Sequence, residues 1–454
     1  MTPNILLFLT DDHAQWALGC YGNREIRTPT LDYLAQTGVQ MRHAFTPTPV
    51  CSPARACLHT GQLASQHGLH DYLSTDDPAI DAHNWLGDAA TLAQLLRDAG
   101  YQTAQSGKWH LGRDEHPQAG FDQWFTLGRG WPIPHQGPHL YGFDGEHHSI
   151  PGNITRVVTD KAISFLHQRE ANKPFFLTVG YYATHSPWQD HPERLVSSYR
   201  QCTFADIPND VMHPFGRQNL ESTDATRNNP REALAQYYAA VTEIDEGIGR
   251  LLDELEALGV LDDTLIIYTS DHGLNCGHHG IWGKGNGTLP LNMLEESIRI
   301  PLIVWQSGLA VGHQQRQEFV DHLDTFQTIL EAAHVTPPEG NYAGRSFWPL
   351  VQNRHIPDWR RVQFGEYGDV RMVRTEQYKL ITRADVPSEL FDLQADPREV
   401  RNLLGAAGYE AVVTELTAVL HTHFTHYQDP LKNGLRVRDL PQHNFTEAWR
   451  TSEY

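Results

Sequence analysis

Short apolar runs alternate with amphipathic stretches over the first three quarters of the chain. NILLFLT (4–10) and FFLTVGYYA (175–183) have the pattern of buried strands, whereas TLAQLLRDAG (91–100) and ITRVVTDKAISFLHQRE (154–170) space their apolar residues three and four apart. Such alternation predicts an α/β fold with a mostly parallel central sheet flanked by helices.

The clearest helix–strand unit lies between residues 230 and 273. An amphipathic helix is predicted to end near Gly259, and a buried strand rich in β-branched residues follows over 264–269. This strand delivers Asp271 and His272 at its carboxyl end, the edge of an open α/β sheet at which ligands bind.

The first predicted strand also ends in acidic residues, Asp11 and Asp12. Adjacent carboxylates repel each other and are costly to bury unless a cation compensates them. Taken alone, the pair fits a helix cap or a solvated turn equally well. Because a second strand ends in Asp271 and His272, the metal site is the better interpretation.

The pattern changes near residue 356. Three β-like runs follow without intervening helices, and a helical pattern comes after them. These segments are RVQFGEY (361–367), VRMVRTEQYKLITR (370–383), SELFDL (388–393) and the helical YEAVVTELTAVLHTHF (409–424). We therefore expect a catalytic domain over residues 1–355 and a smaller antiparallel α+β domain over residues 356–454.

Composition narrows the compartment and the partners. The 454 residues carry a formal net charge of −20, which argues against nucleic acid or an anionic membrane as partner, because either requires a basic face. The amino-terminal apolar run Ile5–Leu9 has no basic stretch before it, and no window approaches the roughly 18 apolar residues of a membrane span. Five cysteines without CxxC spacing form neither a disulfide framework nor a thiolate zinc site. We expect a cytoplasmic enzyme.

Cys51 stands in a Pro-punctuated stretch, CSPAR, that has the pattern C-x-P-x-R with Pro53 and Arg55. A thiol in such a place could be a nucleophile, a metal ligand, half of a disulfide or a site of modification. The chain holds six further motifs, one before Cys51 and five after it. In chain order they are LTDDH (9–13), GKWHLG (107–112), THSPW (184–188), SDHG (270–273), GIWGKG (280–285) and LFDLQADPREVRNL (390–403). Together they resemble the type I sulfatases of the alkaline phosphatase superfamily.

The resemblance implies that Cys51 is oxidised to formylglycine, an aldehyde, by a formylglycine-generating enzyme acting on the nascent chain. The hydrate of an aldehyde has two hydroxyls on one carbon, so one can attack sulfur and the other can then expel sulfate. It also implies a divalent cation, for which we expect Ca²⁺ with Mg²⁺ or Mn²⁺ as alternatives. The implied ligands are Asp11, Asp12, Asp271, His272 and the modified Cys51.

The remaining roles are likewise implied by the resemblance. Arg55 would hold the nucleophile beside the metal-site carboxylates. Lys108 and Lys284 would bind the sulfate oxygens, since cleavage of a sulfate ester needs cations around its charged oxygens and an acid for the leaving oxygen. His110 would take the proton that releases sulfate, and His185, with Lys284, would serve the leaving oxygen.

Two positions depart from the family pattern. Gln62 follows Thr-Gly where the family often has Arg, which bears on how well Cys51 is converted. His272 stands where many relatives have Asn; oxygen ligands suit calcium, and an imidazole widens the choice of metal.

We predict hydrolysis of a carbohydrate sulfate, with aryl or choline sulfate next. The alternative is a phosphonate monoester or phosphodiester hydrolase of the same superfamily, in which the Lys108 and His110 pair is typically Tyr and Thr. A further alternative is a non-catalytic sulfate- or metal-binding relative whose cysteine stays unmodified. Such a protein should have lost some polar site residues, and none is missing here. The aromatic segment 130–152 is expected to be a loop over the pocket or an ordinary surface loop. His70, Asp71 and Tyr72 are expected to touch a sugar hydroxyl or a cationic group.

Overall fold

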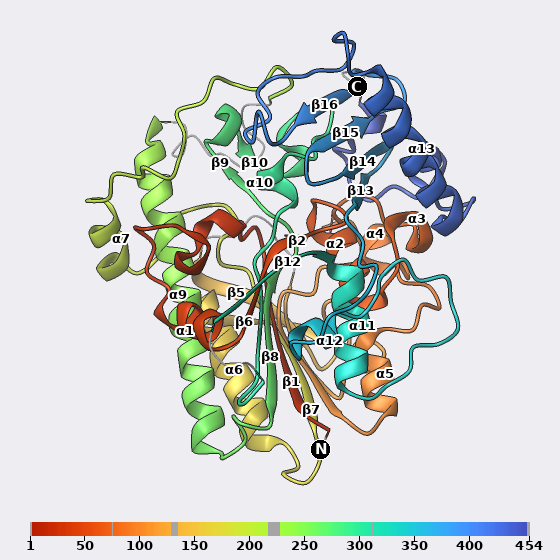
Figure 1. Cartoon of the computed structure of the whole chain (residues 1–454). Coiled ribbons are helices and arrows are strands. Elements are labelled where there is room, and N and C mark those ends of the chain that lie inside the picture. Colours follow the sequence, from red (N-terminus) through yellow and green to blue (C-terminus); the bar gives the residue numbers. More distant parts are fainter. Residues whose placement is uncertain (1, 75, 129–134, 217–227, 310–312, 452–454) are drawn as a thin grey trace.

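The structure is a computed structural model that describes residues 2–74, 76–128, 135–216, 228–309 and 313–451 (Figure 1). The described residues form a mixed sheet in the strand order β12-β2-β11-β8-β1-β7-β3-β4-β5-β6. The strands are β1 Asn4–Thr10, β2 Val39–Phe45, β3 Gln102–Gly107, β4 Gln123–Leu127, β5 Gln136–Phe143, β6 Glu146–Asn153, β7 Phe175–Tyr181, β8 Thr264–Ser270, β11 Leu302–Trp305 and β12 Gln314–Asp321. The central run from β8 to β4 is parallel throughout, whereas β11 and the β5–β6 pair are antiparallel to their neighbours. The predicted α/β class is confirmed.

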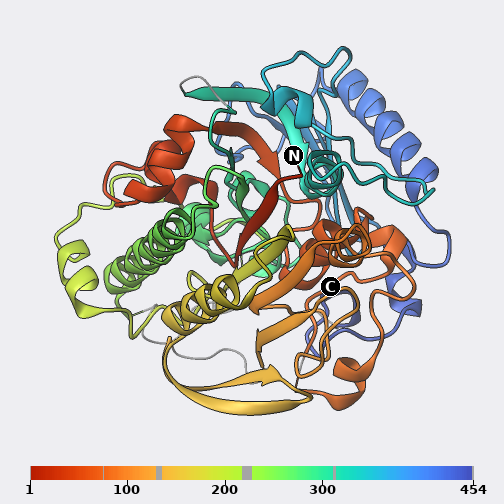
Figure 2. The ribbon, with the colours of Figure 1, turned by 90° about the horizontal axis from the view of Figure 1, so that it is seen from below.

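Helices cover both faces of this sheet (Figures 1 and 2). One face carries α1 Pro29–Thr37, α6 Ile154–Gln168, α7 Glu193–Tyr199 and α9 Pro230–Ala257, and the other carries α2 Cys51–Thr60, α5 Leu92–Asp98, α11 His322–Ala332 and α12 Trp348–Val351. Short helices α3 Ala64–His67, α4 Pro78–Ala82 and α10 Glu295–Ile298 lie in the connections. Along β1, Leu6 and Phe8 face the first layer, whereas Ile5, Leu7 and Leu9 face the second. Because both faces are covered, the strand is continuously apolar from Ile5 to Leu9.

The helix ends follow local sequence signals. The Thr91 side chain accepts a hydrogen bond from the Gln94 backbone N–H at the start of α5, and Asn153 accepts one from Arg156 at the start of α6. Both are capping interactions that satisfy backbone donors left open by the helix. Gly259, with φ of 67°, stops the long α9 helix two residues after its last helical residue, as the sequence predicts.

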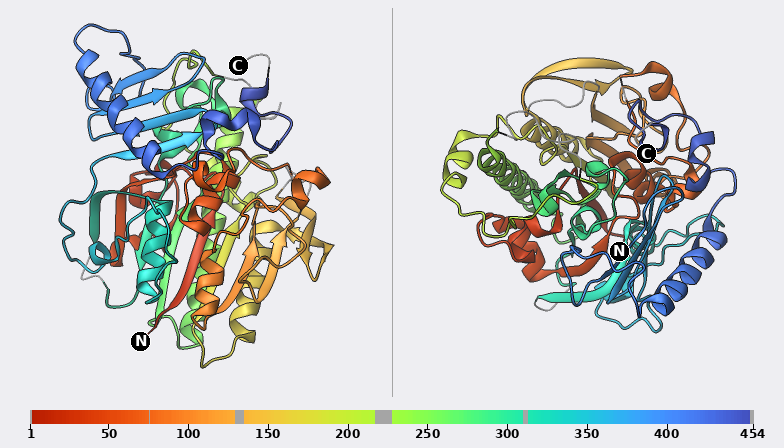
Figure 3. Two further views of the ribbon diagram at one scale, coloured as in Figure 1. Left: turned by 90° about the vertical axis from the view of Figure 1, so that its right-hand side faces the viewer. Right: turned by 90° about the horizontal axis from the view of Figure 1, so that it is seen from above.

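The carboxyl-terminal part is an antiparallel sheet with a helix packed on it (Figure 3). Its elements are β13 Gln363–Tyr367, β14 Val370–Arg374, β15 Tyr378–Thr382, β16 Glu389–Asp392 and α13 Glu410–Tyr427. The single run expected over 370–383 is two strands, because the chain turns after Arg374 and the Thr375 N–H donates to the Tyr378 carbonyl. The sheet lies above the edge at which β1 and β8 end (Figure 3). The domain boundary at residue 356 stays a prediction.

The segment 130–152 differs from the expected loop. Residues 136–143 and 146–153 are β5 and β6, a hairpin on the far edge of the main sheet, and residues 130–134 lie outside the described residues. Asp144 and Gly145 connect the strands with positive φ values of 55° and 83°, as a tight two-residue hairpin turn requires. No helix among the described residues is both long and apolar enough to cross a membrane.

Candidate active site

The two acidic strand ends meet because β1 and β8 are neighbours in the sheet. They pair in parallel, with Thr10 opposite Ser270, so Asp11 and Asp12 leave the sheet beside Asp271 and His272. The Asp271 N–H donates to the Thr10 carbonyl at 3.1 Å. All four side chains are fully buried. The expected convergence at one edge of the sheet is present.

Cys51 enters the same site as the first residue of α2. Its side chain is 2% exposed, and its sulfur lies 3.3 Å from Oδ1 of Asp11 and 3.3 Å from Nε2 of His272. Burial, reinforced by the Asp11 carboxylate, raises the pKa of the Cys51 thiol well above its ordinary value. An unmodified thiol here is therefore protonated and is a poor nucleophile.

Four side chains, Asp11, Asp12, Cys51 and His272, place one ligand atom each within 4.8 Å of the others. Burial raises the pKa of Asp12, and its Oδ2 is buried without a hydrogen-bond partner among the described residues. The protein's own cations thus leave this carboxylate incompletely compensated. A divalent cation fits this donor set and would supply the missing charge.

The fifth expected ligand, Asp271, is held differently. Its Oδ1 accepts the backbone N–H groups of Asp12 and His272, at 3.3 and 2.9 Å. Its Oδ2 accepts Nε of Arg55 at 3.0 Å and forms an ion pair with Nη2 at 2.9 Å. Arg55 also donates to the Lys108 carbonyl at 3.1 Å. The guanidinium therefore joins the nucleophile helix to two strand ends, and the Asp271 carboxylate faces Arg55.

Two lysines flank the cluster. Lys284 Nζ lies 2.8 Å from Oδ1 of Asp12 and 3.5 Å from the Cys51 sulfur, and Lys108 Nζ contacts Oδ2 of Asp11. Burial alone would raise the pKa of Asp11. Cations around it, the nearest being Lys108, instead hold that pKa well below its ordinary value.

Two histidines complete the predicted set. His185 follows β7; its Nδ1 lies 2.7 Å from the Ser186 carbonyl and its Nε2 lies 3.9 Å from Oδ2 of Asp12. His110 Nε2 lies 3.0 Å from the Leu73 carbonyl, and burial, with the nearby Lys108 ammonium, lowers the pKa of His110 well below its ordinary value. Strand alternation does not relate Lys108 to His110, because β3 ends at Gly107 and His110 has a φ of 63°.

Comparison with known proteins identifies the family. A family model described as sulfatase matches residues 3–335. The chain belongs to the sulfatase family. A second model, described as the carboxyl-terminal part of N-sulphoglucosamine sulphohydrolase, matches residues 277–426. This sulfatase is therefore an enzyme that hydrolyses sulfate esters.

Relatives cover nearly the whole of this sulfatase. It is 30% identical to the N-acetylglucosamine-6-O-sulfatase of Bacteroides thetaiotaomicron, across 94% of this chain and 87% of that protein. A structure solved in complex with its substrate D-glucosamine-2-N,6-O-disulfate has a TM-score of 0.81 and 28% identity, across 94% of this chain and 98% of that one. The phosphonate monoester hydrolase of Agrobacterium radiobacter has a TM-score of 0.75 at 23% identity, across 93% and 96% of the two chains, and shares the fold.

The segment behind the nucleophile contacts the carboxyl-terminal part of the protein. His70 is buried and its Nε2 lies 2.7 Å from the Lys432 carbonyl, and Asp71 is buried and accepts the Tyr367 hydroxyl at 2.6 Å. Both side chains thus join the segment after α3 to the carboxyl-terminal part of the sulfatase, and the expected contact with a substrate stays a prediction. Tyr72 is partly exposed, and its hydroxyl lies 2.5 Å from that of Thr446.

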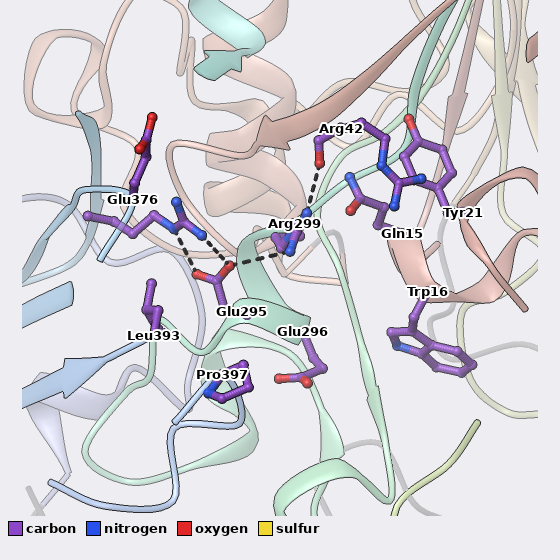
Figure 4. A pocket seen from close by; sticks show the side chains of 11 residues that line it. Gln15, Trp16, Tyr21, Arg42, Glu295, Glu296, Arg299, Glu376, Leu393 and Pro397 are labelled. Carbon is purple, nitrogen blue, oxygen red and sulfur yellow. Dashed lines mark hydrogen bonds and ion pairs between the residues drawn. The ribbon is translucent and has the colours of Figure 1, made fainter. Parts of the chain in front are cut away.

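A cavity of about 340 Å³ lies away from the cluster, between the start of α10 and the carboxyl-terminal sheet (Figure 4). Its charges are largely paired with one another. Glu295 accepts Arg374 at 3.1 and 3.3 Å and lies 3.7 Å from Arg299, while Glu296 accepts His279 Nε2 at 2.9 Å. The cavity wall is therefore an ion-pair network that joins α10 to the carboxyl-terminal sheet.

Proposed function

We propose that this sulfatase hydrolyses a carbohydrate sulfate ester with the formylglycine form of residue 51 as nucleophile. The observation that carries the proposal is the position of Cys51, with its sulfur 3.3 Å from both Asp11 Oδ1 and His272 Nε2 and 3.5 Å from Lys284 Nζ. Burial raises the pKa of the thiol, so the unmodified side chain stays protonated and is a poor nucleophile. Conversion to an aldehyde, whose hydrate has reactive hydroxyls, would supply the nucleophile at this position. A formylglycine-generating enzyme is the implied partner.

A divalent cation, for which we propose calcium, would be held by Asp11, Asp12, His272 and residue 51. Bound there, it would neutralise the buried carboxylates and make a neighbouring hydroxyl more acidic. Asp271 would act through Arg55: the carboxylate fixes the guanidinium, and the guanidinium fixes the backbone around the site. Asp271 would remain available to the cation through Oδ1, which lies 3.5 Å from Nε2 of His272, while its Oδ2 faces Arg55.

The remaining side chains provide binding and proton transfer. Lys108 and Lys284 would bind the sulfate oxygens, exchanging their present contacts with Asp11 and Asp12 for the anionic substrate. His185, with Lys284, would serve the leaving oxygen through Nε2, because its Nδ1 is engaged in donating to the Ser186 carbonyl. His110, kept neutral by burial, would accept the proton whose removal releases sulfate.

The carbohydrate substrate is supported by the N-acetylglucosamine-6-O-sulfatase relative and by the complex with D-glucosamine-2-N,6-O-disulfate. The alternatives are an aryl or choline sulfate, or a phosphonate monoester or phosphodiester. Lys108 and His110 favour sulfate over phosphonate, since the phosphonate monoester hydrolases of this superfamily typically have Tyr and Thr at these two positions. The cytoplasmic location stays a prediction from the sequence.

The test compares matched nitrophenyl sulfate and nitrophenyl phosphonate esters. Peptide mass first establishes what fraction of residue 51 is aldehyde, and kcat/KM is then measured for both esters. A clear preference for the sulfate ester supports the proposal, and a panel of sulfated sugars follows, with choline sulfate as the comparison. A preference for the phosphonate ester would assign the site to the alternative chemistry.

A further inference from the structure

Lys284 is carried by a loop with little regular structure. It follows the two-stranded ribbon of β9 (Asn275–Cys276) and β10 (Trp282–Gly283), and the loop continues to α10 at Glu295. A single short 3-10 turn, Gly285–Gly287, lies between β10 and α10. The Lys284 side chain is nevertheless 3% exposed and reaches Asp12 at 2.8 Å. The position of the ammonium therefore depends on whatever fixes the backbone of this loop.

Asn292 closes the loop on itself. Its side chain is 1% exposed, and Nδ2 donates to the carbonyls of Lys284 at 2.9 Å and Gly285 at 3.1 Å. The Asn292 backbone N–H donates to the same Gly285 carbonyl at 2.9 Å. Nδ2 also donates to the Thr288 hydroxyl at 3.2 Å. The other bonds end on the main chain of Lys284 or of its neighbour, so the amide fixes the point from which the lysine side chain extends.

The amide is itself held in one orientation. Its Oδ1 accepts the hydroxyl of Ser297 at 2.8 Å, and that hydroxyl accepts Nδ2 of Asn275 at 2.9 Å. Asn275 also donates to the Gly283 carbonyl at 2.9 Å, directly before Lys284. A buried chain of three polar side chains therefore spans from the ribbon to the loop, with Asn292 at its end. Such connected networks rigidify the groups they join.

The clamped backbone also touches the segment that leads into Cys51. The Gly285 N–H donates to the Pro49 carbonyl at 3.1 Å, two residues before the nucleophile. A Cβ on Gly285 would lie 2.7 Å from Cγ and 2.8 Å from the carbonyl oxygen of Pro49, so this close approach requires glycine. The contacts of Asn292 thus fix the position of Lys284 relative to the segment that precedes Cys51.

The far end of the loop is anchored by the carboxyl-terminal sheet. Lys379 Nζ donates to the Met293 carbonyl at 2.8 Å, and the Glu295 N–H donates to Glu399 at 2.7 Å. The Glu295 carboxylate faces Arg299 in the ion-pair network of the cavity (Figure 4). Asn292 directly precedes Met293, the first anchored residue, and its side chain links this fixed backbone to the main chain of Lys284.

We propose that Asn292 is a positioning residue that fixes the ammonium of Lys284 over the reaction centre. The inference rests on the proposed function, because it takes Lys284 as the group that binds the sulfate oxygens. Among the hydrogen bonds and ion pairs of the described residues, none joins Asn292 to Cys51 or to a metal ligand. It acts through the main chain of Lys284 and Gly285.

A double-mutant cycle tests the proposal in the full-length, aldehyde-containing enzyme. The variants are Asn292→Ala, Lys284→Ala and the double variant, and kcat/KM for nitrophenyl sulfate is normalised to the aldehyde content of residue 51. We expect Asn292→Ala alone to lower kcat/KM by about 10- to 100-fold, because small displacements of a positioned group have effects of that order. In the Lys284→Ala background it should change kcat/KM by less than about twofold.

The outcomes separate the two proposals. Equal losses from Asn292→Ala in both backgrounds would mean that Asn292 is merely structural and would overturn the positioning proposal. An unimpaired Lys284→Ala enzyme would instead overturn the role of Lys284 in the proposed function. As a matched control, Asn23 is also buried and also holds a loop, with its Oδ1 accepting the Ile26 N–H at 2.9 Å. Asn23→Ala should leave kcat/KM within about twofold of wild type.

A second variant covers the case in which Asn292→Ala does not fold. Ser297→Ala removes only the hydroxyl that orients the Asn292 amide. It should lower kcat/KM in the same direction but by less, and this loss should disappear when Lys284 is Ala. A loss that persists in the Lys284→Ala background, or no loss at all, would contradict the proposal.

Discussion

The sulfur of Cys51 lies 3.3 Å from Nε2 of His272, although 221 positions separate the two residues. Cys51 begins a helix on one face of the sheet, and His272 follows a central strand. Their contact exists because β8 pairs with β1 and α2 begins at the same carboxyl edge. The fold therefore assembles the site from separate segments, each held by buried structure.

Replacement of Cys51 tests the nucleophile. Cys51→Ala removes the thiol through which the side chain is oxidised to the aldehyde, so we expect turnover of nitrophenyl sulfate to fall by at least about 10³-fold. The side chain is small, and its loss should leave the fold intact, as thermal unfolding would show. Substantial residual turnover would exclude a covalent mechanism through residue 51. Cys51→Ser should at best form a sulfated enzyme that does not turn over, which intact-protein mass would reveal.

The residue types of the site could be predicted from the sequence, but the contacts between these residues could not. Acidic residues after two buried strands indicate a cation site, because carboxylates at the same sheet edge need compensation. Which strands are neighbours depends on long-range packing, and so does the turn of the Asp271 carboxylate toward Arg55. Asn292 gives no local signal, since its role lies in where its amide hydrogens point. The Asp144–Gly145 pair is a local hairpin signal, and it marks the turn between β5 and β6 where we expected a loop.

Arg55 offers a test of the buried ion pair. Its Nε and Nη2 reach Asp271 Oδ2 at 3.0 and 2.9 Å, and its Nη1 reaches the Lys108 carbonyl at 3.1 Å. Arg55→Lys keeps the charge but cannot make all three contacts. We expect thermal and urea unfolding to show a loss of about 1–3 kcal/mol. Arg97→Lys, in an exposed pair with Asp122, is the control and should change stability by less than about 1 kcal/mol.

Removal and replacement of the metal tests the donor set. Chelation should abolish turnover, and added Ca²⁺ should restore it. His272→Asn replaces an imidazole nitrogen with an amide oxygen, so we expect the variant to favour Ca²⁺ over Mn²⁺ more strongly than the wild type does. Metal content and recovered activity are measured after reconstitution with Ca²⁺, Mg²⁺ or Mn²⁺. Turnover that survives complete chelation, or an unchanged metal preference in His272→Asn, would contradict this assignment.

Glu243 on α9 makes the stability of the protein depend on pH. It is 3% exposed and 3.1 Å from Nδ1 of His191; burial raises the pKa of Glu243 to about 7, and burial lowers the pKa of His191 to about 3. The folded state therefore holds the Glu243 proton more tightly than the unfolded state, whose pKa is near 4.5. The associated stability is fully present below pH 4.5 and is lost as the pH rises through 7.

Glu243→Gln isolates this contribution, because the amide keeps the shape of the side chain and does not titrate. Between pH 5 and pH 8.5, the free energy of unfolding of the wild type should fall relative to that of Glu243→Gln by about 2–3 kcal/mol. Urea unfolding of the two proteins at both pH values, with metal saturating, gives this difference directly. A difference that stays constant with pH would show that Glu243 is already ionised in the folded protein at pH 5.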